Sequence, residues 1–150
     1  MRNAIWWVAS LLAASQARAD PDAGVVECQI IRVLPDGRLR LSFSGREDNA
    51  ALRGIQGAPP PVDYVNIVAR AATRHVKPAG CTVDSSNPLV VSISVYGWQD
   101  KSGDVWLDLA TLLLDEGAAH ADPGQSWAVE RERAASRKRK EERRKTTEKR

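Results

Sequence analysis

The chain has few of the residues that build metal centres or large aromatic cores. Of its 150 residues, two are cysteine, two are histidine and 5% are aromatic. Two cysteines cannot supply a four-cysteine zinc site, and two histidines leave little for a histidine-rich metal centre. The length excludes two full domains, a bundle of several membrane spans and a barrel of about 250 residues. With 43% hydrophobic and 27% charged residues, the composition suits one small soluble domain.

The apolar run near the start is too short to cross a membrane. It covers residues 4–14, follows Arg2 and precedes the small-x-small sequence of residues 17–19. A membrane span needs about 20 apolar residues, roughly twice this length. The pattern predicts a signal peptide of residues 1–19, cleaved after Ala19. We therefore expect an exported protein, periplasmic or secreted, with no membrane span after cleavage; the alternative is an uncleaved anchor.

The two cysteines gain a meaning from this expected export. In an oxidising compartment, an even pair such as Cys28 and Cys81 is expected to form a disulfide. The bridge would close a loop of roughly fifty residues, for which chain entropy predicts about 4 kcal/mol of stabilisation. The alternative is two buried, unpaired thiols.

The charges divide the mature chain into two parts. Residues 20–125, the expected domain, carry nine Lys/Arg and fourteen Asp/Glu, a net charge of −5. Residues 126–150, the expected polar helix or tail, carry eleven against five, a net charge of +6. The tail can bind nucleic-acid phosphates or another polyanion, or it can be a solvated helix with i,i+4 pairs such as Glu141–Lys145. The candidate polyanion-binding residues are Arg137, Lys138, Arg139, Lys140, Arg143 and Arg144.

The order of hydrophobic patterns predicts strands first and helices between and after them. Strands are expected at residues 25–33, 38–43, 50–55, 81–83, 89–98 and 105–107. Helices are expected at residues 64–75, 109–116 and 127–150. His75 is expected to be a packing or capping residue of the first helix. The pattern predicts an α+β protein built on a small five-stranded Greek-key OB-type barrel with about three helices, the barrel closing around Ile55, Ile93 and Val95.

This order, with its motifs, resembles the staphylococcal (micrococcal) nuclease family, also called thermonucleases. The similarity runs from about residue 25 to residue 144. The family's Asp-Gly-Asp-Thr turn corresponds to Asp36-Gly37-Arg38-Leu39, and its Arg-Leu-x-Gly-Ile-Asp-x-Pro-Glu motif to residues 51–60. Residues 104–119 resemble the family's Val-Asn-x-x-Leu-Val-x-x-Gly-Leu-Ala stretch, but the last helix lacks the usual Gly-Leu-Trp ending. The resemblance implies an OB barrel carrying three helices.

The resemblance also implies a calcium site, but the ligands are replaced. In the family two aspartates hold the ion, and their counterparts here are Arg38 and Gln56. Only the turn acid Asp36 is retained. Calcium takes six to eight oxygen ligands, commonly including carboxylates, so an arginine at this position removes a ligand and adds a repelling charge. We expect no cofactor; calcium would be needed only if the chain were an active nuclease.

The catalytic residues that the resemblance implies are replaced as well. The two arginines that bind the reacting phosphate in the family correspond to Ala51 and to Asn87 or Pro88, and the general-base glutamate corresponds to Pro60. Phosphodiester hydrolysis depends on cations placed around the nonbridging oxygens, which these residues cannot provide. The sequence therefore predicts a domain that has lost metal-dependent hydrolysis.

Two other arginines could still bind an anion. Arg53 lies two positions beyond the expected family arginine, and residues two apart in a strand share a face. Arg38 and Arg53 could therefore converge on a phosphate-sized anion. The alternative is an ordinary solvated face on which they pair with acids such as Asp36 or Glu47.

These observations lead to two functional hypotheses. The first is an exported, catalytically degenerate binding module for nucleic acid or for a partner protein of the cell envelope. The second is a secreted or periplasmic nuclease that hydrolyses DNA or RNA with rearranged active-site residues. A different small β fold with a structural role is the remaining alternative.

Overall fold

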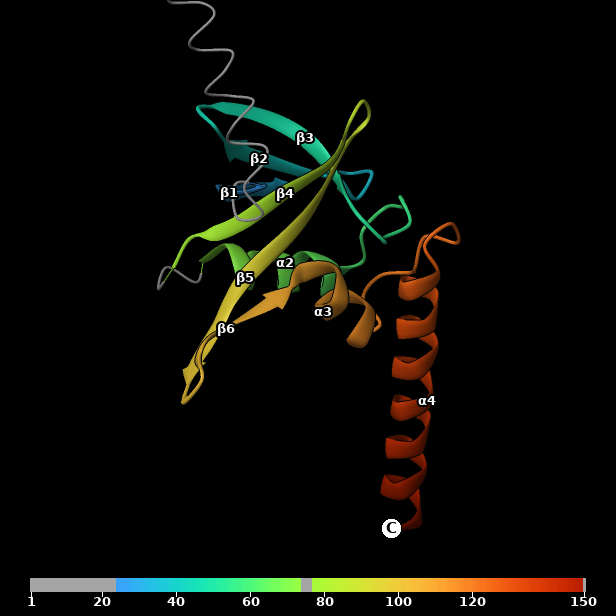
Figure 1. Cartoon of the computed structure of the whole chain (residues 1–150). Helices are drawn as coiled ribbons and strands as arrows, with labels where there is room; N and C mark the ends of the chain where they lie inside the picture. Colours follow the sequence, from blue (N-terminus) through green and yellow to red (C-terminus); the bar gives the residue numbers. More distant parts are fainter. Residues whose placement is uncertain (1–23, 74–76, 150) are drawn as a thin grey trace, which may run out of the picture.

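The computed structural model describes residues 24–73 and 77–149. Within them the chain is an α+β structure with a six-stranded, mainly antiparallel sheet and three helices (Figure 1). The strands are β1 (Val25–Val33), β2 (Leu39–Phe43), β3 (Arg46–Leu52), β4 (Ala79–Ser86), β5 (Leu89–Asp100) and β6 (Gly103–Asp108). The helices are α2 (Val62–Thr73), α3 (Leu109–Asp115) and α4 (Ser126–Glu148). The expected leader, residues 1–19, and His75 lie outside the described residues.

The sheet is curled, so that the edge strand β3 comes back to contact β5. The hydrogen-bonded order is β3-β2-β1-β4-β5-β6, and β3 also pairs with β5 in parallel. That parallel contact contains two residue pairs, Ala51 with Val90 and Leu52 with Val91. Closure of the ring is therefore limited to these two pairs.

The sheet has six strands, where the sequence analysis expected a barrel of five. β5 continues past the ring and turns at residues 100–103 into β6, which pairs with it from Ser94–Asp108 to Asp100–Gly103. The third strand also begins earlier than expected, at Arg46 instead of residue 50. Its turn consists of Ser44 and Gly45, both with positive φ, which is the geometry of a tight two-residue hairpin.

The predicted disulfide is confirmed. Cys28 on β1 and Cys81 on β4 are bonded, with Cα atoms 5.8 Å apart and a sequence separation of 53. Both residues are buried in the core. The bridge therefore ties together two neighbouring strands, one from each side of α2 in the sequence, and agrees with an oxidising environment.

The core lies inside the curled sheet and against α2 and α3. β2 alternates as predicted, with Leu39 and Leu41 buried and Arg40 between them partly exposed. Ile93 and Val95 on β5 are buried as expected. Ile55 is only partly buried, because it follows the end of β3 and pairs there with Ala121.

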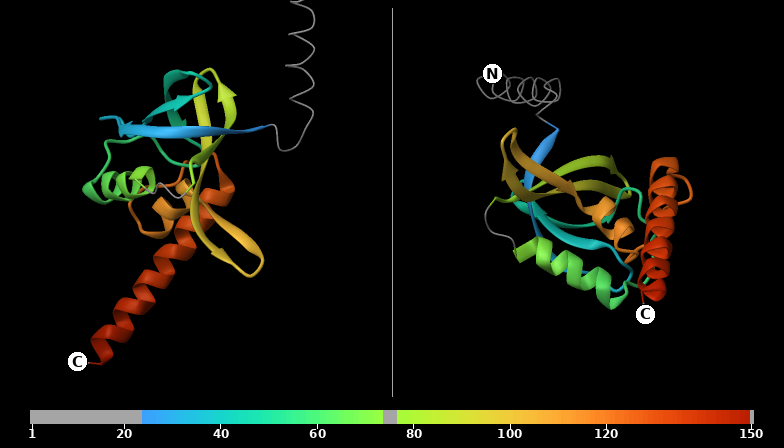
Figure 2. Two further views of the ribbon diagram at one scale, coloured as in Figure 1. Left: turned by 90° about the vertical axis from the view of Figure 1, so that its left-hand side faces the viewer. Right: turned by 90° about the horizontal axis from the view of Figure 1, so that it is seen from below.

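The two shorter helices cover one end of the sheet (Figures 1 and 2). α2 contacts β1 and α3, and buries Tyr64 and Val68. α3 begins directly after β6, where the Asp108 carboxylate accepts a hydrogen bond from the Thr111 N–H at 2.8 Å. Such a cap satisfies a backbone donor that the first helical turn leaves free.

α4 is different in kind, because it leaves the body of the protein. Its first turns pack against α3, and its remainder projects beyond the sheet and the other helices (Figure 1). From Lys140 to Lys149 every residue is exposed. No helix among the described residues is both long and apolar enough to cross a membrane.

Candidate functional site

Ion pairs and backbone hydrogen bonds fix the first half of α4 on α3. The guanidinium of Arg131 binds the Asp115 carboxylate with two parallel hydrogen bonds, Nε to Oδ1 and Nη2 to Oδ2, each 2.7 Å long. Paired bonds of this type orient both side chains as well as attracting them. Next to Asp115, the side chain of Leu114 is fully buried against Ala128 of α4.

Arg139 continues this attachment one turn after Ala135. Its Nη1 donates a 2.5 Å hydrogen bond to the backbone oxygen of Asp115, at the carboxyl end of α3. Gly117, with φ of +69°, ends α3, and a Cβ at this position would come within 3.0 Å of the Arg139 guanidinium. Because helix ends leave carbonyl oxygens without partners, a cation there is stabilising. Arg139 therefore anchors α4 to the carboxyl end of α3.

Glu132 makes a third attachment, from α4 to the loop before it. Its carboxylate accepts a hydrogen bond from the Ala121 N–H at 3.0 Å, and its Oε1 lies 2.8 Å from His120 Nδ1. Burial by itself would raise the pKa of Glu132, but the hydrogen bonds from Ala121 and His120 outweigh it and lower the pKa below its usual value. The charged carboxylate is thus the form that holds the loop.

A glycine makes room for the start of α4. Gly54, just after β3, has φ of +88°, and a Cβ there would lie 2.4 Å from the Trp127 ring. Trp127 and its neighbour Ala128 therefore pack directly on the backbone that follows β3. This contact places the start of the helix beside residues 51–54, at the end of β3.

The face of α4 opposite these attachments is a continuous row of cations. Arg133, Arg137, Lys140 and Arg144 are spaced by four, three and four residues, so they are neighbours along one side of the helix. We call them the outer stripe. All four are exposed, and the stripe spans about 16 Å at 1.5 Å per residue. The residues that touch the body, such as Glu132, Ala135 and Arg139, have the same spacing on roughly the opposite side.

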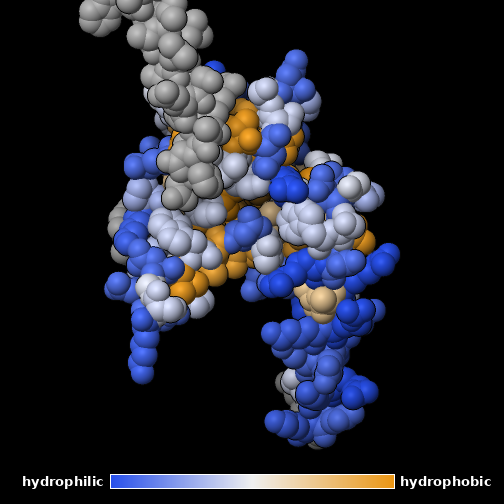
Figure 3. All heavy atoms as spheres, in the orientation of Figure 1, coloured by the Kyte–Doolittle hydropathy of each residue, from blue (hydrophilic) through white to orange (hydrophobic). Residues whose placement is uncertain are grey.

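The remaining tail cations are divided among other faces of the helix. Lys138 and Arg143 are exposed, and within the described residues neither takes part in an ion pair. The expected pair of Lys145 with Glu141 is present at 3.0 Å, and Arg144 lies 3.7 Å from Glu148. Exposed pairs of this type hold their charges weakly, so the Arg144 cation stays available to a ligand. Figure 3 shows the projecting part of α4 as a largely hydrophilic surface.

Two of the predicted site residues line one hollow at the end of β3. Ala51 and Arg53 border a space of about 490 Å³, together with Asp84 of β4 and Asp122. Arg53 Nη1 lies 3.7 Å from Asp84 Oδ1. The hollow therefore contains one arginine with an acidic neighbour and a second acid, which reduces its attraction for a phosphate.

Arg38 is held in a different place, the turn between β1 and β2. Its Nε donates to Asp36 Oδ2 at 2.7 Å, and its backbone N–H donates to Asp36 Oδ1 at 3.1 Å. These bonds lower the pKa of Asp36, the backbone bond contributing most. Tyr64 fixes the same turn by donating its hydroxyl to the Gly37 oxygen at 2.8 Å, and burial raises the pKa of Tyr64 to about 12.

Arg38 does not line the hollow that Arg53 borders, and each of the two arginines has an acidic neighbour. Arg38 pairs with Asp36, as the solvated-face interpretation expects, and Arg53 lies near Asp84, which sequence reasoning missed. No recorded contact within the described residues joins the two arginines.

The other replaced family positions are scattered around this region. Gln56 is exposed, and its backbone N–H donates to the His120 oxygen at 2.9 Å. Pro60 borders an apolar groove between β1 and α2. Asn87 and Pro88 form the turn between β4 and β5, joined by a cis peptide bond. None of these four side chains carries the charge of the residue with which the resemblance aligns it.

The oxygen ligands needed for calcium do not come together. Asp36, the retained acid, already has its carboxylate on Arg38. Within residues 24–73 and 77–149, no group of three or more His, Cys, Asp or Glu side chains is arranged to hold a metal ion. The residues at the family's metal positions therefore do not fit calcium.

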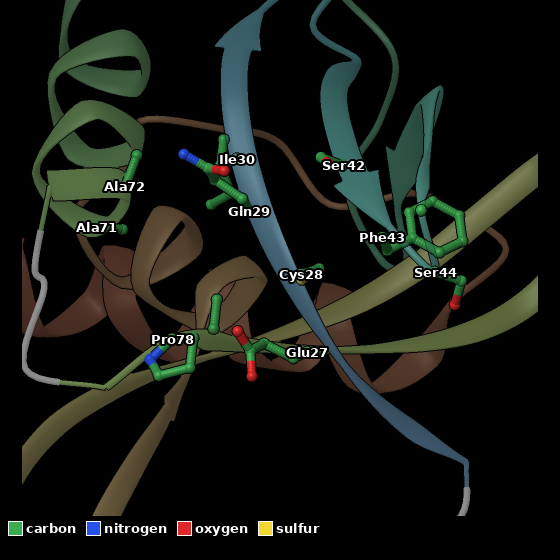
Figure 4. Close-up of a pocket in the computed structure, with 12 residues that line it drawn as sticks. Glu27, Cys28, Gln29, Ile30, Ser42, Phe43, Ser44, Ala71, Ala72 and Pro78 are labelled. Carbon is green, nitrogen blue, oxygen red and sulfur yellow. The ribbon is translucent and has the colours of Figure 1, made fainter.

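A separate hollow of about 500 Å³ lies beside the disulfide, between β1, the end of β2 and α2 (Figure 4). Glu27 and Gln29 on β1 line it, facing Ala72 and Pro78 across the opening (Figure 4). Among the described residues that line this hollow, none is lysine or arginine, and Glu27 contributes a carboxylate.

The sequence analysis did not distinguish the residues that anchor α4 from those that form its outer stripe. Arg133 was outside the predicted set, although its spacing from Arg137 places it on the outer stripe. The anchoring residues Asp115 and Glu132 carry no local signal, because their partners are distant in the sequence. No protein-family model matches this chain, and no curated protein gives a significant match.

Proposed function

We propose that this chain is an exported, nuclease-like OB-fold protein that has lost metal-dependent hydrolysis and binds nucleic acid through the outer stripe of α4. The stripe is the observation that carries the proposal. Its four cations are exposed, and beside Arg133 and Arg137 the opposite face of the helix is fixed to the body. A ligand would therefore meet an ordered row of charges.

The topology supports an OB-type barrel. The meander of β1, β2 and β3, the return of β4 beside β1, and the parallel contact of β3 with β5 give the cyclic order expected of a Greek-key OB barrel. β6 and α3 then continue from β5 in the order that the resemblance implies. The small residue Gly54, which follows Arg53 in the family-like motif, has the positive φ that a sharp turn requires.

The region around Arg53 supports the loss of catalysis. A phosphate in the family cleft needs two arginines and a metal ion, whereas here Arg53 faces Asp84, and Arg38 is paired with Asp36. Catalysis of phosphoryl transfer relies on positive charge that is already in place when the transition state forms. The cleft lacks that arrangement.

The dimensions of the stripe support a nucleic-acid ligand. Duplex DNA carries one negative charge per about 1.7 Å of helix axis, so several phosphates are available along the roughly 16 Å of the stripe. No aromatic side chain follows Trp127, so the outer stripe offers no aromatic ring on which bases could stack. We therefore expect binding without sequence preference, governed by phosphate contacts.

Export is supported by the leader-like residues 1–19 and by the disulfide between Cys28 and Cys81, which forms in oxidising compartments. Extracellular or periplasmic nucleic acid would then be the relevant ligand.

The proposal can be tested by fluorescence anisotropy with a labelled 20-base-pair duplex and the mature chain. In the first variant, glutamine replaces all four stripe residues, Arg133, Arg137, Lys140 and Arg144. In the matched control, glutamine replaces four exposed cations of the body, namely Arg32, Arg46, Arg70 and Lys101. Both variants lose four positive charges, so only the position of the charges differs.

If four phosphates are neutralised, the affinity of the wild-type chain should fall roughly 100-fold between 50 and 200 mM salt, since log K falls by about 0.9 per contact and per log unit of salt. The stripe variant should lose most of this dependence, and the body variant should keep it. Equal losses in the two variants would show that net charge alone matters. No affinity in any form would favour a protein partner of the envelope instead.

Hydrolysis is tested separately, by nicking of supercoiled plasmid with calcium and with chelator. We expect no cleavage in either condition. Calcium-dependent cleavage that is abolished by Arg53→Ala would favour the alternative, a working phosphodiesterase with rearranged residues.

A further inference from the structure

β6 is the one strand of the described sheet that has a neighbour on only one side. Every other strand pairs with at least two others, because the contact of β3 with β5 joins the two ends of the ring. β6 pairs with β5 alone. Its outer edge therefore presents backbone N–H and C=O groups that no strand of the described chain covers.

Of the residues that usually keep sheet edges apart, the free part of this edge has one, the carboxylate of Asp104. The strand contains neither lysine nor proline. The next helix, α3, begins only after the strand has ended at Asp108. The acid at the tip of β6, Asp104, is neutralised by an ion pair with Lys77. The hydrogen bond to Asp104 raises the pKa of Lys77.

Apolar side chains flank the edge on both faces of the hairpin. Trp106 is 43% exposed and packs edge-to-face on Tyr96, with ring centroids 5.7 Å apart. Trp98 is 52% exposed and stands opposite Val105 in the register of β5 and β6. Because neighbouring residues of a strand point to opposite faces, Val105 and Trp106 occupy different faces. A strand added to this edge would bury aromatic surface on both sides.

We infer that the edge of β6 is covered by the β6 strand of a second copy of this chain, paired antiparallel about a twofold axis at Val105. The register follows from the length of the free edge. Asp108 already caps α3, so the strand is free from Gly103 to Leu107, and the middle of this segment is Val105. The twofold axis then sets Val105 opposite its copy and Gly103 opposite Leu107.

The shape of the protein leaves room for this pairing. The β5–β6 hairpin extends from one side of the body and α4 from the other (Figures 1 and 2). In the proposed register Asp104 faces Trp106 of the second copy, so no two acids stand directly opposite each other. Like residues meet only at Val105, where an apolar pair suits a twofold axis.

The experiment uses cysteine cross-linking and sedimentation on the oxidised, mature chain. Directly opposite residues of an antiparallel pair have Cα atoms about 4.5–5.5 Å apart, which lies within the range that a disulfide spans. Val105→Cys should therefore form a covalent dimer through position 105. Val62→Cys is the control, because Val62 is 74% exposed and lies on α2. The native disulfide is checked by mass spectrometry of peptides in both variants.

Sedimentation equilibrium provides the second arm and does not depend on an introduced thiol. The wild-type chain should show a concentration-dependent dimer, and Val105→Lys should raise the dimer dissociation constant by at least tenfold, because it places two like charges on the axis. Val62→Lys should leave that constant unchanged. A wild-type chain that is monomeric at every concentration, or a dimer that Val105→Lys leaves intact, would overturn the inference. Equal cross-linking of the two cysteine variants would also count against it.

Discussion

Both halves of α4 are rich in charged residues, but the apolar residues of the helix all lie in the first half, and only that half is attached to the body. In the first half Arg131, Glu132 and Arg139 bind the α3 carboxylate, the loop before α4 and the α3 end. In the second half, from Lys140 onward, all residues are exposed. A charged helix can thus be structural or ligand-binding, depending on whether another element lies beside it. What separates the halves is the position of α3.

The largest effect should come from removing the apolar contact between the anchored half and α3. Leu114 is fully buried against Ala121 and Ala128. We expect Leu114→Ala to reduce the free energy of unfolding by about 3 kcal/mol, because it leaves a cavity that the helices cannot close. Urea denaturation measures this loss. The matched change Leu112→Ala, at a partly buried leucine of the same helix, should cost clearly less. Equal costs would mean that the contact with α4 adds nothing.

A substitution outside the helix tests the same anchored half. Gly54→Ala adds a methyl group beside the Trp127 ring and forces a residue with a Cβ into a positive φ. The expected loss of unfolding free energy is about 2 kcal/mol. Gly57→Ala is the control, because Gly57 has open space around it and no positive φ. Its effect should stay within about 0.5 kcal/mol. If Gly54→Ala is equally mild, α4 is not held on the backbone after β3.

Acid should weaken the anchored half before it affects the projecting half. The pKa of Glu132 is lower in the folded chain than its ordinary value of 4.5, so the unfolded chain binds the proton more readily. The contribution of Glu132 is therefore complete above about pH 4.5 and is lost as the pH falls through the lowered pKa. At pH 7, Glu132→Gln should cost about 1 kcal/mol of unfolding free energy, and this difference from wild type should shrink towards zero at pH 3.

Denaturation curves at several pH values measure this dependence. Glu130→Gln, on an exposed position of the same helix, should show no comparable pH-dependent difference. A constant cost of Glu132→Gln from pH 7 to pH 3 would mean that the charge of this carboxylate does not hold the loop.

The elements that could be predicted from the sequence are those whose signals are local. Alternation in β2 identified its buried face, and the two cysteines predicted the bond between β1 and β4. The start of β3 was missed because Arg46–Asn49 are polar residues on an exposed part of a strand, which resembles a loop. The sequence also could not show that β6 lies outside the ring of strands, because the ring is defined by the contact of β3 with β5, which are distant in the sequence.

The site was less predictable, because its residues acquire their roles from distant partners. Arg137 and Arg139 stand in the same basic run, and nothing near them in the sequence distinguishes them. Arg139 becomes structural through the carbonyl oxygens of α3, some 24 positions earlier. The outer stripe, in contrast, follows from spacing alone and could have been found by projecting the run onto a helix.

The smallest effect on stability should come from the outer stripe, which runs along both halves of α4. Replacing Arg133, Arg137, Lys140 and Arg144 by glutamine removes four exposed charges, of which only Arg144 has a recorded ion pair among the described residues. Exposed pairs contribute at most about 1 kcal/mol, and glutamine keeps a good helix propensity, so unfolding free energy should change by less than about 0.5 kcal/mol. Arg139→Gln, a single change, should cost more because it strips the α3 end of its cation. Urea denaturation of both variants at the same salt concentration gives the comparison. A stripe variant that is less stable than Arg139→Gln would show that the outer charges are structural, and the distinction between the outer stripe and the anchoring face of α4 would not hold.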